Sequence, residues 1–290
     1  MTRGSIVTTV MRTAGVCACL LFVQTYAWAQ TPVPPAEQTA AQPAETSDPD
    51  IPVDALQPDF NLAALPTTLR MPVGKWAFRV THRFTRPLGQ GDFGDLVSDA
   101  FGFDSSALIG LELRYGLLPG TQVGVHRTSD RTIQLFAQHN FLNERDGRPL
   151  GLDVIGTFEG ENNLRGERRG AFGLVASRNL ARRAAVYIEP LWVTNTNPFG
   201  TGDDFTLLLG LGARVRVRPS TYLVVEASPR LAGHDPDVHQ MSLGLEARAG
   251  GHLFQLNFSN GFATTLGQLA RGGGSYDDWY IGFNIARKFF

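Results

Sequence analysis

The sequence predicts an all-β fold, namely a transmembrane antiparallel up-and-down β-barrel of about twelve strands. Three observations predict it: a secretory signal at the N-terminus, about a dozen segments with period-two hydrophobicity, and connections that alternate between short and long. We expect three regions: a cleaved signal peptide at 1–29, a disordered periplasmic lead-in rich in Pro, Ala and acidic residues at 30–65, and the barrel at 66–290.

The N-terminus has the composition of a signal peptide. Two arginines flank a segment without acidic residues, an apolar run covers 14–23, and a small-x-small cleavage site follows at 27–29. The apolar run is too short to be a spanning helix. Both cysteines, Cys17 and Cys19, lie in this segment. The mature chain is therefore expected to have no thiol, no disulfide and no cysteine-based metal or redox site.

The lead-in has no hydrophobic periodicity. Residues 30–59 contain acidic residues and no basic one, and they are rich in proline and alanine. Such a segment buries too little apolar surface to offset its ordering entropy, so we expect disorder. The whole chain has 26 basic and 27 acidic residues, a net charge of −1, which excludes a typical nucleic-acid footprint.

Period-two alternation begins near residue 68 and recurs to the C-terminus. In "TLLLGLGARVRVRP", the odd positions 207–217 are apolar, whereas the even positions carry glycine and arginine. Segments of about ten residues with one apolar and one polar face are typical of membrane barrels, since strands of soluble sandwiches are commonly about five or six residues long. The expected strands are 74–85, 107–117, 121–128, 131–142, 150–159, 170–180, 183–195, 204–218, 221–229, 239–250, 252–260 and 278–289.

The connections fall into two classes. Even-numbered strands lead to the next strand through mostly tight turns, whereas odd-numbered strands lead to it mostly through long loops, the first at 86–106 and the last at 261–277. Short periplasmic turns and long outer loops indicate a bacterial outer-membrane barrel with both termini in the periplasm. The last strand ends in the aromatic residue Phe290, as expected of a protein that the outer-membrane assembly machinery recognises. Period-two alternation counted back from Phe290 places the charged Lys288 on the same face as this aromatic residue. We therefore expect the last residues to be bulged or to protrude.

Three runs together resemble a known family. They are "GKWAFRVTHRF", the pair "FGFDSSALIGLELRYGL" and "TQVGVHRTSDRTIQLFAQHNFLNE", and "GGHLFQLNFSNG". In order and spacing they resemble the DUF5777 family of bacterial β-barrel proteins across most of the mature chain. The resemblance implies a single outer-membrane barrel. It implies no activity and no catalytic residue.

The run "HLFQLNFSNGF" is close to the His-x-Ser-Asn-Gly motif of outer-membrane phospholipases. The position of the base is filled by Asn257, which cannot accept a proton from Ser259. The phenylalanines of this strand are expected to face the lipid, so Asn257 and Ser259 should face the lumen. In the phospholipases, the corresponding residues face the membrane. A distant histidine, His252 or His126, is the remaining candidate base. We therefore predict no enzyme and no catalytic residue.

We expect no cofactor and no metal ion, although His234 and His239 bracket an Asp-rich loop. The alternation points most strand charges into the lumen. The expected lumen-lining residues are Lys75, Arg79, Arg83, Glu112, Arg114, Asp153, Glu189, Arg214, Arg216, Arg218, Glu226, Glu246, Arg248, Asn257 and Ser259. Unpaired charges in a narrow barrel are costly, so most should pair.

Three functions remain open at this stage. The first is a narrow porin-like pore, or a binding barrel, for a small solute, with a slight anion preference from the arginines. The second is a closed structural barrel that serves as a docking platform through the lead-in and the loop at 86–106. The third is a membrane-embedded lipid hydrolase, which the strand parity disfavours. The expected partners are outer-membrane lipid, the assembly machinery and a small solute, with no nucleic acid.

Overall fold

The computed structural model describes residues 55–181 and 183–290. The signal peptide expected at 1–29 and the lead-in at 30–54 lie outside the described residues. The strands are β1 (Trp76–Phe84), β2 (Ala107–Leu118), β3 (Thr121–Thr128), β4 (Ile133–Leu142), β5 (Gly151–Gly160), β6 (Arg168–Leu180), β7 (Ala184–Thr194), β8 (Phe205–Arg218), β9 (Thr221–Ser228), β10 (Arg230–Gly233), β11 (Gln240–Ala249), β12 (His252–Ser259) and β13 (Tyr280–Phe289).

Short helical segments lie between some strands. They are α1 (Phe93–Ser98), α2 (Glu161–Leu164), α3 (Leu266–Arg271) and the 3-10 turns η1 (Ala100–Gly102) and η2 (Glu144–Asp146). Within the described ranges, none of these helices has the length and apolar character that a membrane crossing requires.

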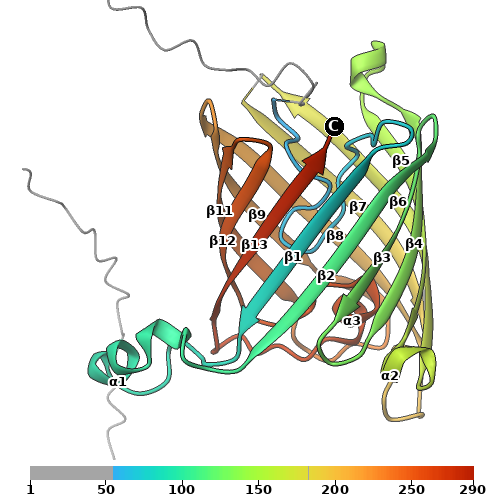
Figure 1. Ribbon diagram of the computed structural model, residues 1–290. Coiled ribbons are helices and arrows are strands. Elements are labelled where there is room, and N and C mark those ends of the chain that lie inside the picture. Colours follow the sequence, from blue (N-terminus) through green and yellow to red (C-terminus); the bar gives the residue numbers. More distant parts are fainter. Residues whose placement is uncertain (1–54, 182) are drawn as a thin grey trace, which may run out of the picture. The chain divides into compact units, whose positions relative to one another are not determined.

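The strands close into one antiparallel barrel (Figure 1). Each strand pairs with its neighbours in sequence, and β1 closes the barrel against β13 with Trp76 opposite Phe289. Only Pro229 separates β9 from β10, and both pair with β8, so they form one strand with an interruption. Proline lacks an N–H, but its carbonyl oxygen still accepts from Leu209 N at 2.8 Å. The barrel therefore has twelve strands, with limits within two residues of those predicted, except that the ninth continues to Gly233.

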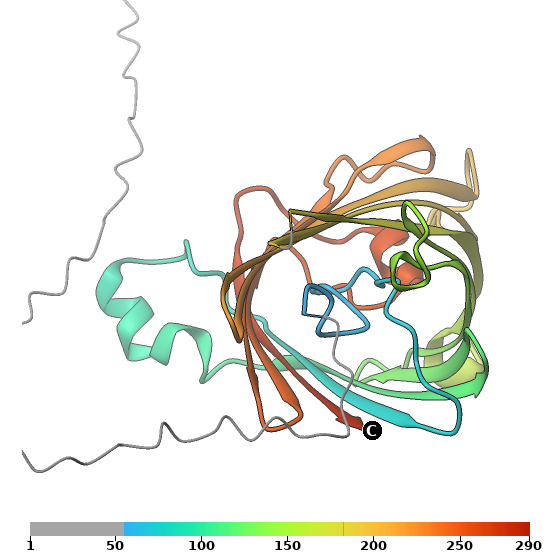
Figure 2. The ribbon, with the colours of Figure 1, turned by 90° about the horizontal axis from the view of Figure 1, so that it is seen from above.

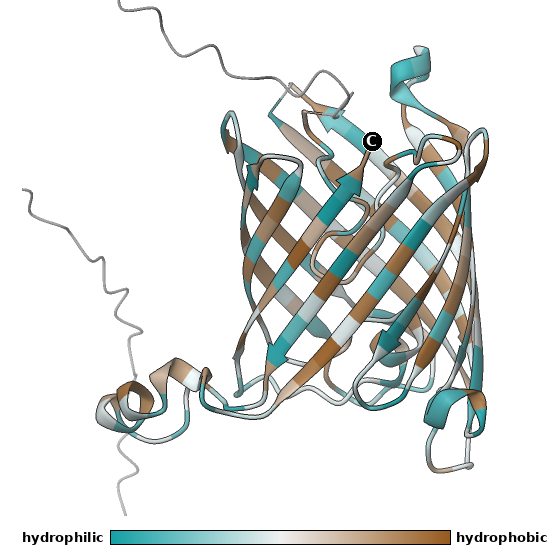
Figure 3. Cartoon of the chain, viewed as in Figure 1, coloured by the Kyte–Doolittle hydropathy of each residue, from teal (hydrophilic) through white to brown (hydrophobic). Residues whose placement is uncertain are grey.

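Alternation along each strand separates an apolar outer surface from the interior (Figure 3). In β8, Val215 and Val217 are exposed on the outside, whereas Leu208 and Arg214 are completely buried. A continuous apolar belt results, as lipid requires. Other exposed members of the belt are Phe78, Leu111, Leu113, Leu135, Phe172, Trp192, Leu243, Leu245 and Phe254.

The C-terminal strand keeps its register to the end. Phe289 is exposed on the outer surface beside Trp76, and Lys288 donates a hydrogen bond to the carbonyl oxygen of Pro58 inside the barrel. Phe290 packs against an interior cluster that includes Phe60 and Met71. The expected bulge is therefore wrong: Phe289 is the outward aromatic residue, and Phe290 turns inward.

The two ends of the barrel differ in the length of their connections, as predicted. One end has tight turns and the C-terminus; we call it the short-turn end. The other end, the long-loop end, has the connections that contain α1, α2 and α3 (Figure 1). The turn at 129–132 is the short exception at that end.

Residues 55–71 run inside the barrel, where Figure 2 shows them as the blue trace; we call them the plug segment. All but the first and Arg70 are buried, and Leu56, Phe60, Leu62 and Leu65 contribute to the interior clusters. Residues 55–65 were expected to be disordered, and this expectation is wrong. The physical reason is that their few leucines and Phe60 find a partner surface in the lumen, which a composition argument about the segment alone leaves out.

The direction of the outer belt can be tested by placing a charge in it. Leu245→Arg, in the middle of β11, should lower the free energy of unfolding by about 2–4 kcal/mol, because an arginine on the lipid face near the bilayer midplane costs that amount. Val217→Arg, one residue from the end of β8, is the matched control and should cost no more than about 1 kcal/mol. Guanidinium unfolding in phospholipid vesicles measures both. Equal costs would contradict the assigned faces.

Candidate functional site in the barrel interior

The plug segment folds back on itself in the lumen. Thr67 N donates to Phe60 O at 2.8 Å, Leu62 N donates to Leu65 O at 2.7 Å, and Asn61 forms a bridge with Pro66. These contacts make a tight turn at 61–66, which we call the plug turn. The turn satisfies few of its own peptide groups, so the remaining ones must find partners on the wall.

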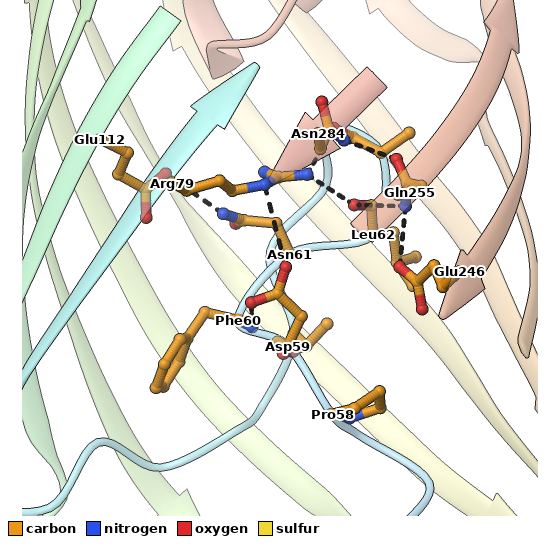
Figure 4. Close-up of polar contacts among 12 residues, drawn as sticks. Pro58, Asp59, Phe60, Asn61, Leu62, Arg79, Glu112, Glu246, Gln255 and Asn284 are labelled. Atoms are coloured by element: carbon orange, nitrogen blue, oxygen red, sulfur yellow. Dashed lines mark hydrogen bonds and ion pairs between the residues drawn. The ribbon is translucent and has the colours of Figure 1, made fainter. Parts of the chain in front are cut away.

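The carbonyl oxygens of the plug turn face arginines of β1. Arg79 Nη2 donates to Leu62 O at 2.8 Å and to Ala63 O at 2.9 Å, as Figure 4 shows for Leu62 and Arg79. Ala63 O also accepts from Arg83 Nη2 at 3.3 Å and from Asn284 Nδ2 at 3.3 Å. Both guanidinium groups are buried. Two positive charges are thus directed at two neutral carbonyl oxygens.

The amide groups of the same turn face a carboxylate of β9. Glu226 accepts from Ala63 N at 2.9 Å, from Ala64 N at 3.0 and 3.1 Å, and from Leu65 N at 3.1 Å. Ser242 Oγ donates a further bond at 3.2 Å. The plug turn is therefore oriented by its peptide dipoles, with its carbonyl groups toward β1 and its amide groups toward Glu226.

The leucine side chains of the turn fill space next to two glycines of β8. A Cβ atom at Gly212 would lie 2.2 Å from Leu62 Cδ1, and one at Gly210 would lie 3.0 Å from Leu65 Cδ2. Neither glycine has a positive φ, so close approach is what requires glycine here. The surrounding wall from β5 to β9 carries an apolar cluster between its buried charged residues. Its buried members are Ile155, Ala171, Val175, Ala185, Tyr187, Leu191, Val193, Leu208 and Val224.

Ion pairs occupy the rest of the lumen. Arg214 and Glu246, both completely buried, form a bidentate pair with distances of 2.7 and 3.0 Å, and Arg214 also donates to Asn61 O at 2.8 Å. Arg114 pairs with Glu112 at 2.9 Å and lies over the ring of Phe60, 5.1 Å from its centroid. Each pair satisfies a buried charge and also touches the plug segment.

Glu189 on β7 differs from these paired charges. It is completely buried, it points into the lumen between Tyr187 and Leu191, and neither carboxylate oxygen has a hydrogen-bond partner among the described residues. Strand β7 lies half-way around the barrel from β1, which carries Arg79 and Arg83. Among the described residues, an arginine without a wall carboxylate therefore lies on β1, and a carboxyl group without a hydrogen-bond partner lies on the facing strand β7.

The β12–β13 connection closes the lumen toward the long-loop end. Its helix α3 turns inward (Figure 2) and buries Leu266 and Leu269 in the same apolar cluster as the leucines of the plug turn. Arg230 fixes the helix by donating to Leu269 O at 2.7 Å, and Arg271 pairs with Glu161 of α2. A cavity of about 20 Å³ remains beside Ala64. The described lumen is thus closed by two elements, the plug segment and α3.

Most of the predicted lumen-lining residues are buried in the interior. They are Arg79, Arg83, Glu112, Arg114, Asp153, Glu189, Arg214, Glu226, Glu246, Asn257 and Ser259. Lys75 and Arg218 are instead exposed at the short-turn end, and Arg216 and Arg248 are half-buried near it. The prediction is wrong for Lys75 and Arg218 because alternation gives a side-chain direction but not the depth at which the strand leaves the interior.

Other interior residues were missed because the prediction named the charged inward positions and only a few of the uncharged polar ones. The same alternation indicates the amides and the histidine of the polar wall, which are Gln122, His126, Gln134, Gln138, Asn140 and Asn284. Several of them bond to the plug segment; Gln138 Nε2, for example, donates to Thr67 O at 2.8 Å. The signal for the plug segment itself is the largely apolar run "FNLAAL" at 60–65, which lies upstream of the first strand.

Ser259 has no arrangement for nucleophilic catalysis. Its buried hydroxyl donates to Gly261 O at 2.6 Å, and Asn257 Nδ2 donates to Gln255 Oε1 at 3.1 Å. His252 lies at the opposite end of the same strand, next to Arg287, and His126 is on β3, several strands away. In the described part of the chain, no three His, Cys, Asp or Glu side chains form a group able to hold a metal ion.

The family is decided by a match over almost the whole described chain. The model of the membrane bound beta barrel domain DUF5777 matches residues 59–289. The chain belongs to the DUF5777 family. The match begins within the plug segment, so the turn in the lumen lies inside the region that defines the family.

Three solved structures of outer-membrane proteins are similar to this chain, and the first of them shares its fold. The COG4313 outer membrane channel from Pseudomonas putida F1 is 12% identical, with a TM-score of 0.50 over 76% of this chain and 97% of that one. The Acinetobacter baumannii outer membrane protein Omp33 is 10% identical, with a TM-score of 0.44 over 74% and 98%. The outer membrane phospholipase A from Escherichia coli is 11% identical, with a TM-score of 0.39 over 74% and 90%. Comparison with curated proteins gave no match.

Neutralising Glu226 should loosen the plug turn. In a chain with Cys17 and Cys19 replaced by serine, Ala64→Cys places a thiol at a buried position, and maleimide labelling reports its exposure. Adding Glu226→Gln should speed labelling about tenfold or more, because one lost charge-assisted hydrogen bond is worth roughly 1.5–3 kcal/mol. Asp203→Asn, on an exposed loop, is the control and should not change the rate. An unchanged rate in Glu226→Gln would show that the carboxylate does not hold the turn.

The geometry of Ser259 also predicts an outcome for lipid hydrolysis. The purified chain should release no fatty acid from phospholipid vesicles, and Ser259→Ala should behave identically, because the hydroxyl is buried and bonded to a main-chain carbonyl. Release by the unmodified chain that disappears in Ser259→Ala would overturn this prediction.

Proposed function

We propose that the chain is a channel of the bacterial outer membrane that passes small solutes and is closed by its own plug segment. One observation carries the proposal: the segment that fills the lumen is not part of the barrel sheet. Residues 55–71 contribute to none of the paired strands, and the barrel closes through β1 and β13 alone. The segment can therefore leave the lumen without loss of a strand pairing.

The charges of the wall support a passage rather than a permanently closed lattice. In a closed lattice, buried arginines are expected to face wall carboxylates, as Arg214 faces Glu246. Arg83 has no carboxylate within 4 Å among the described residues, and the partner of Arg79 is Asp59 of the plug segment, at 3.8 Å. When the plug segment leaves, these guanidinium groups become available to water and solute.

The orientation and the remaining partners belong to the same proposal. We place the short-turn end with the C-terminus in the periplasm, outer-membrane lipid around the belt, and the assembly machinery at the last strand, and we assign no enzymatic activity. The fold shared with the Pseudomonas putida channel is consistent with this assignment.

A second candidate is a docking platform for surface partners. The loop at 85–106 extends to the side of the barrel (Figure 2) and exposes Phe93, Val97, Phe101 and Phe103. This arrangement requires no passage, so conductance distinguishes the two candidates.

Planar-bilayer conductance of the full chain tests the channel. The unmodified chain should open rarely, whereas Leu62→Ser with Leu65→Ser should conduct for most of the recording. Both serines place hydroxyl groups in an apolar pocket and leave the wall unchanged, so the plug segment is weakened and the lining is not.

One further substitution provides the control, and one outcome of the double variant would contradict the proposal. Leu231→Ser, at an exposed position of β10, should leave the current unchanged. If the double variant folds to the same barrel by heat-modified gel mobility and remains as silent as the unmodified chain, the channel proposal is wrong and the closed platform is favoured.

A further inference from the structure

We propose that the plug turn occupies a binding site for short peptides with aliphatic side chains, and that such a peptide displaces it. The inference rests on the proposed channel function and names its class of solute. It follows from three features of the wall around the turn. Arginines bind its carbonyl oxygens, a carboxylate binds its amides, and an apolar pocket holds its leucine side chains.

The cationic side offers more than a neutral turn requires. Ala63 O accepts from Arg79, Arg83 and Asn284, and Leu62 O accepts from Arg79 and from Gln255 Nε2 at 3.3 Å. A carboxylate has two oxygens and about four acceptor positions, and it pairs with guanidinium more strongly than a carbonyl does. The terminal carboxylate of a peptide would therefore fit this side better than the plug turn does.

The acidic side has carboxylates that lack a cationic partner among the described residues. Glu226 is compensated by three main-chain amides and one hydroxyl, without a cation within 4 Å among the described residues. Glu189, buried on β7, has no hydrogen-bond partner in the same part of the chain. Its side chain adjoins the plug turn, since Glu189 Cβ and Leu65 Cδ2 would both lie 3.0 Å from a Cβ atom at Gly210. The ammonium group of a peptide supplies the charge that this side lacks.

The pocket between the two sides determines which side chains a bound peptide can have. Gly210 and Gly212 leave the space that Leu62 and Leu65 occupy, and the lining is the apolar cluster of the β5 to β9 wall. The space is of leucine size, so it favours aliphatic residues over glycine or charged residues. A free peptide with leucine side chains can make the contacts of the plug turn and add two charge pairs.

Displacement can be measured without any current. Leucyl-leucine is added to the full chain with Ala64→Cys, with Cys17 and Cys19 replaced by serine, and the maleimide labelling rate is compared with and without peptide. We expect a saturable increase. N-acetyl-leucyl-leucine, leucyl-leucine amide and glycyl-glycine, which lack the cation, the anion and the side chains respectively, should each need about tenfold more for the same effect.

Wall variants identify the site. Glu189→Gln and Gly212→Ala should each shift the leucyl-leucine response about tenfold upward in concentration, the first by removing the acidic partner and the second by filling the pocket. The resting labelling rate of each variant is measured first. A weakened plug lowers the peptide concentration needed, so an upward shift reports the lost contact between the wall and the peptide. Asp203→Asn should respond as the parent chain does.

The outcomes separate this inference from the channel proposal. If leucyl-leucine does not change labelling while the Leu62→Ser, Leu65→Ser variant conducts, the peptide site is wrong and the channel stands. If labelling rises equally with all four compounds, the site lacks the proposed specificity and the inference is overturned. If leucyl-leucine acts selectively but no variant conducts, the site stands and the channel does not.

Discussion

The interior of this protein depends on the peptide turn held between two arginines of β1 and Glu226 of β9. The carbonyl oxygens of Leu62 and Ala63 face the guanidinium groups, and the amides of 63–65 face the carboxylate. Buried charges on the wall need partners, and the turn supplies them as aligned peptide dipoles. Without the turn, the same groups would be solvated or would bind something else.

The apolar packing of the lumen follows from the same turn. Membrane barrels that carry water are polar inside, whereas the β5 to β9 wall has a buried apolar cluster. The cluster is stable because the leucines of the plug turn and of α3 cover it, each buried leucine contributing roughly 1.5–3 kcal/mol. The plug segment therefore neutralises the polar half of the lumen and covers the apolar half.

Much of the fold could be predicted from the sequence because a barrel strand is a local pattern. Period-two alternation gave twelve strands and the inward direction of residues such as Arg214 and Glu246, and loop lengths gave the two ends. The plug segment could not be predicted in this way. Its order depends on contacts with residues far along the chain, such as the bond from Asn284 to Ala63, 221 positions away. Neither its composition nor its periodicity contains these contacts.

In the candidate site, the direction of the side chains could be predicted, but their partners could not. Glycines of β8 were predicted to face inward, but their purpose, space for Leu62 and Leu65, needs the plug in place. The pairing of Glu226 with main-chain amides likewise replaces the expected carboxylate–arginine pair. Side-chain direction is a property of the strand, whereas partner choice is a property of the assembled interior.

Hydrogen exchange of the plug amides tests the central claim most directly. In the folded chain in lipid, the amides of Ala63, Ala64 and Leu65 should exchange as slowly as those of the neighbouring strands, because all three are bonded to buried Glu226. Slow exchange of the strands together with exchange of these three amides at the rate of an unstructured chain would contradict the account.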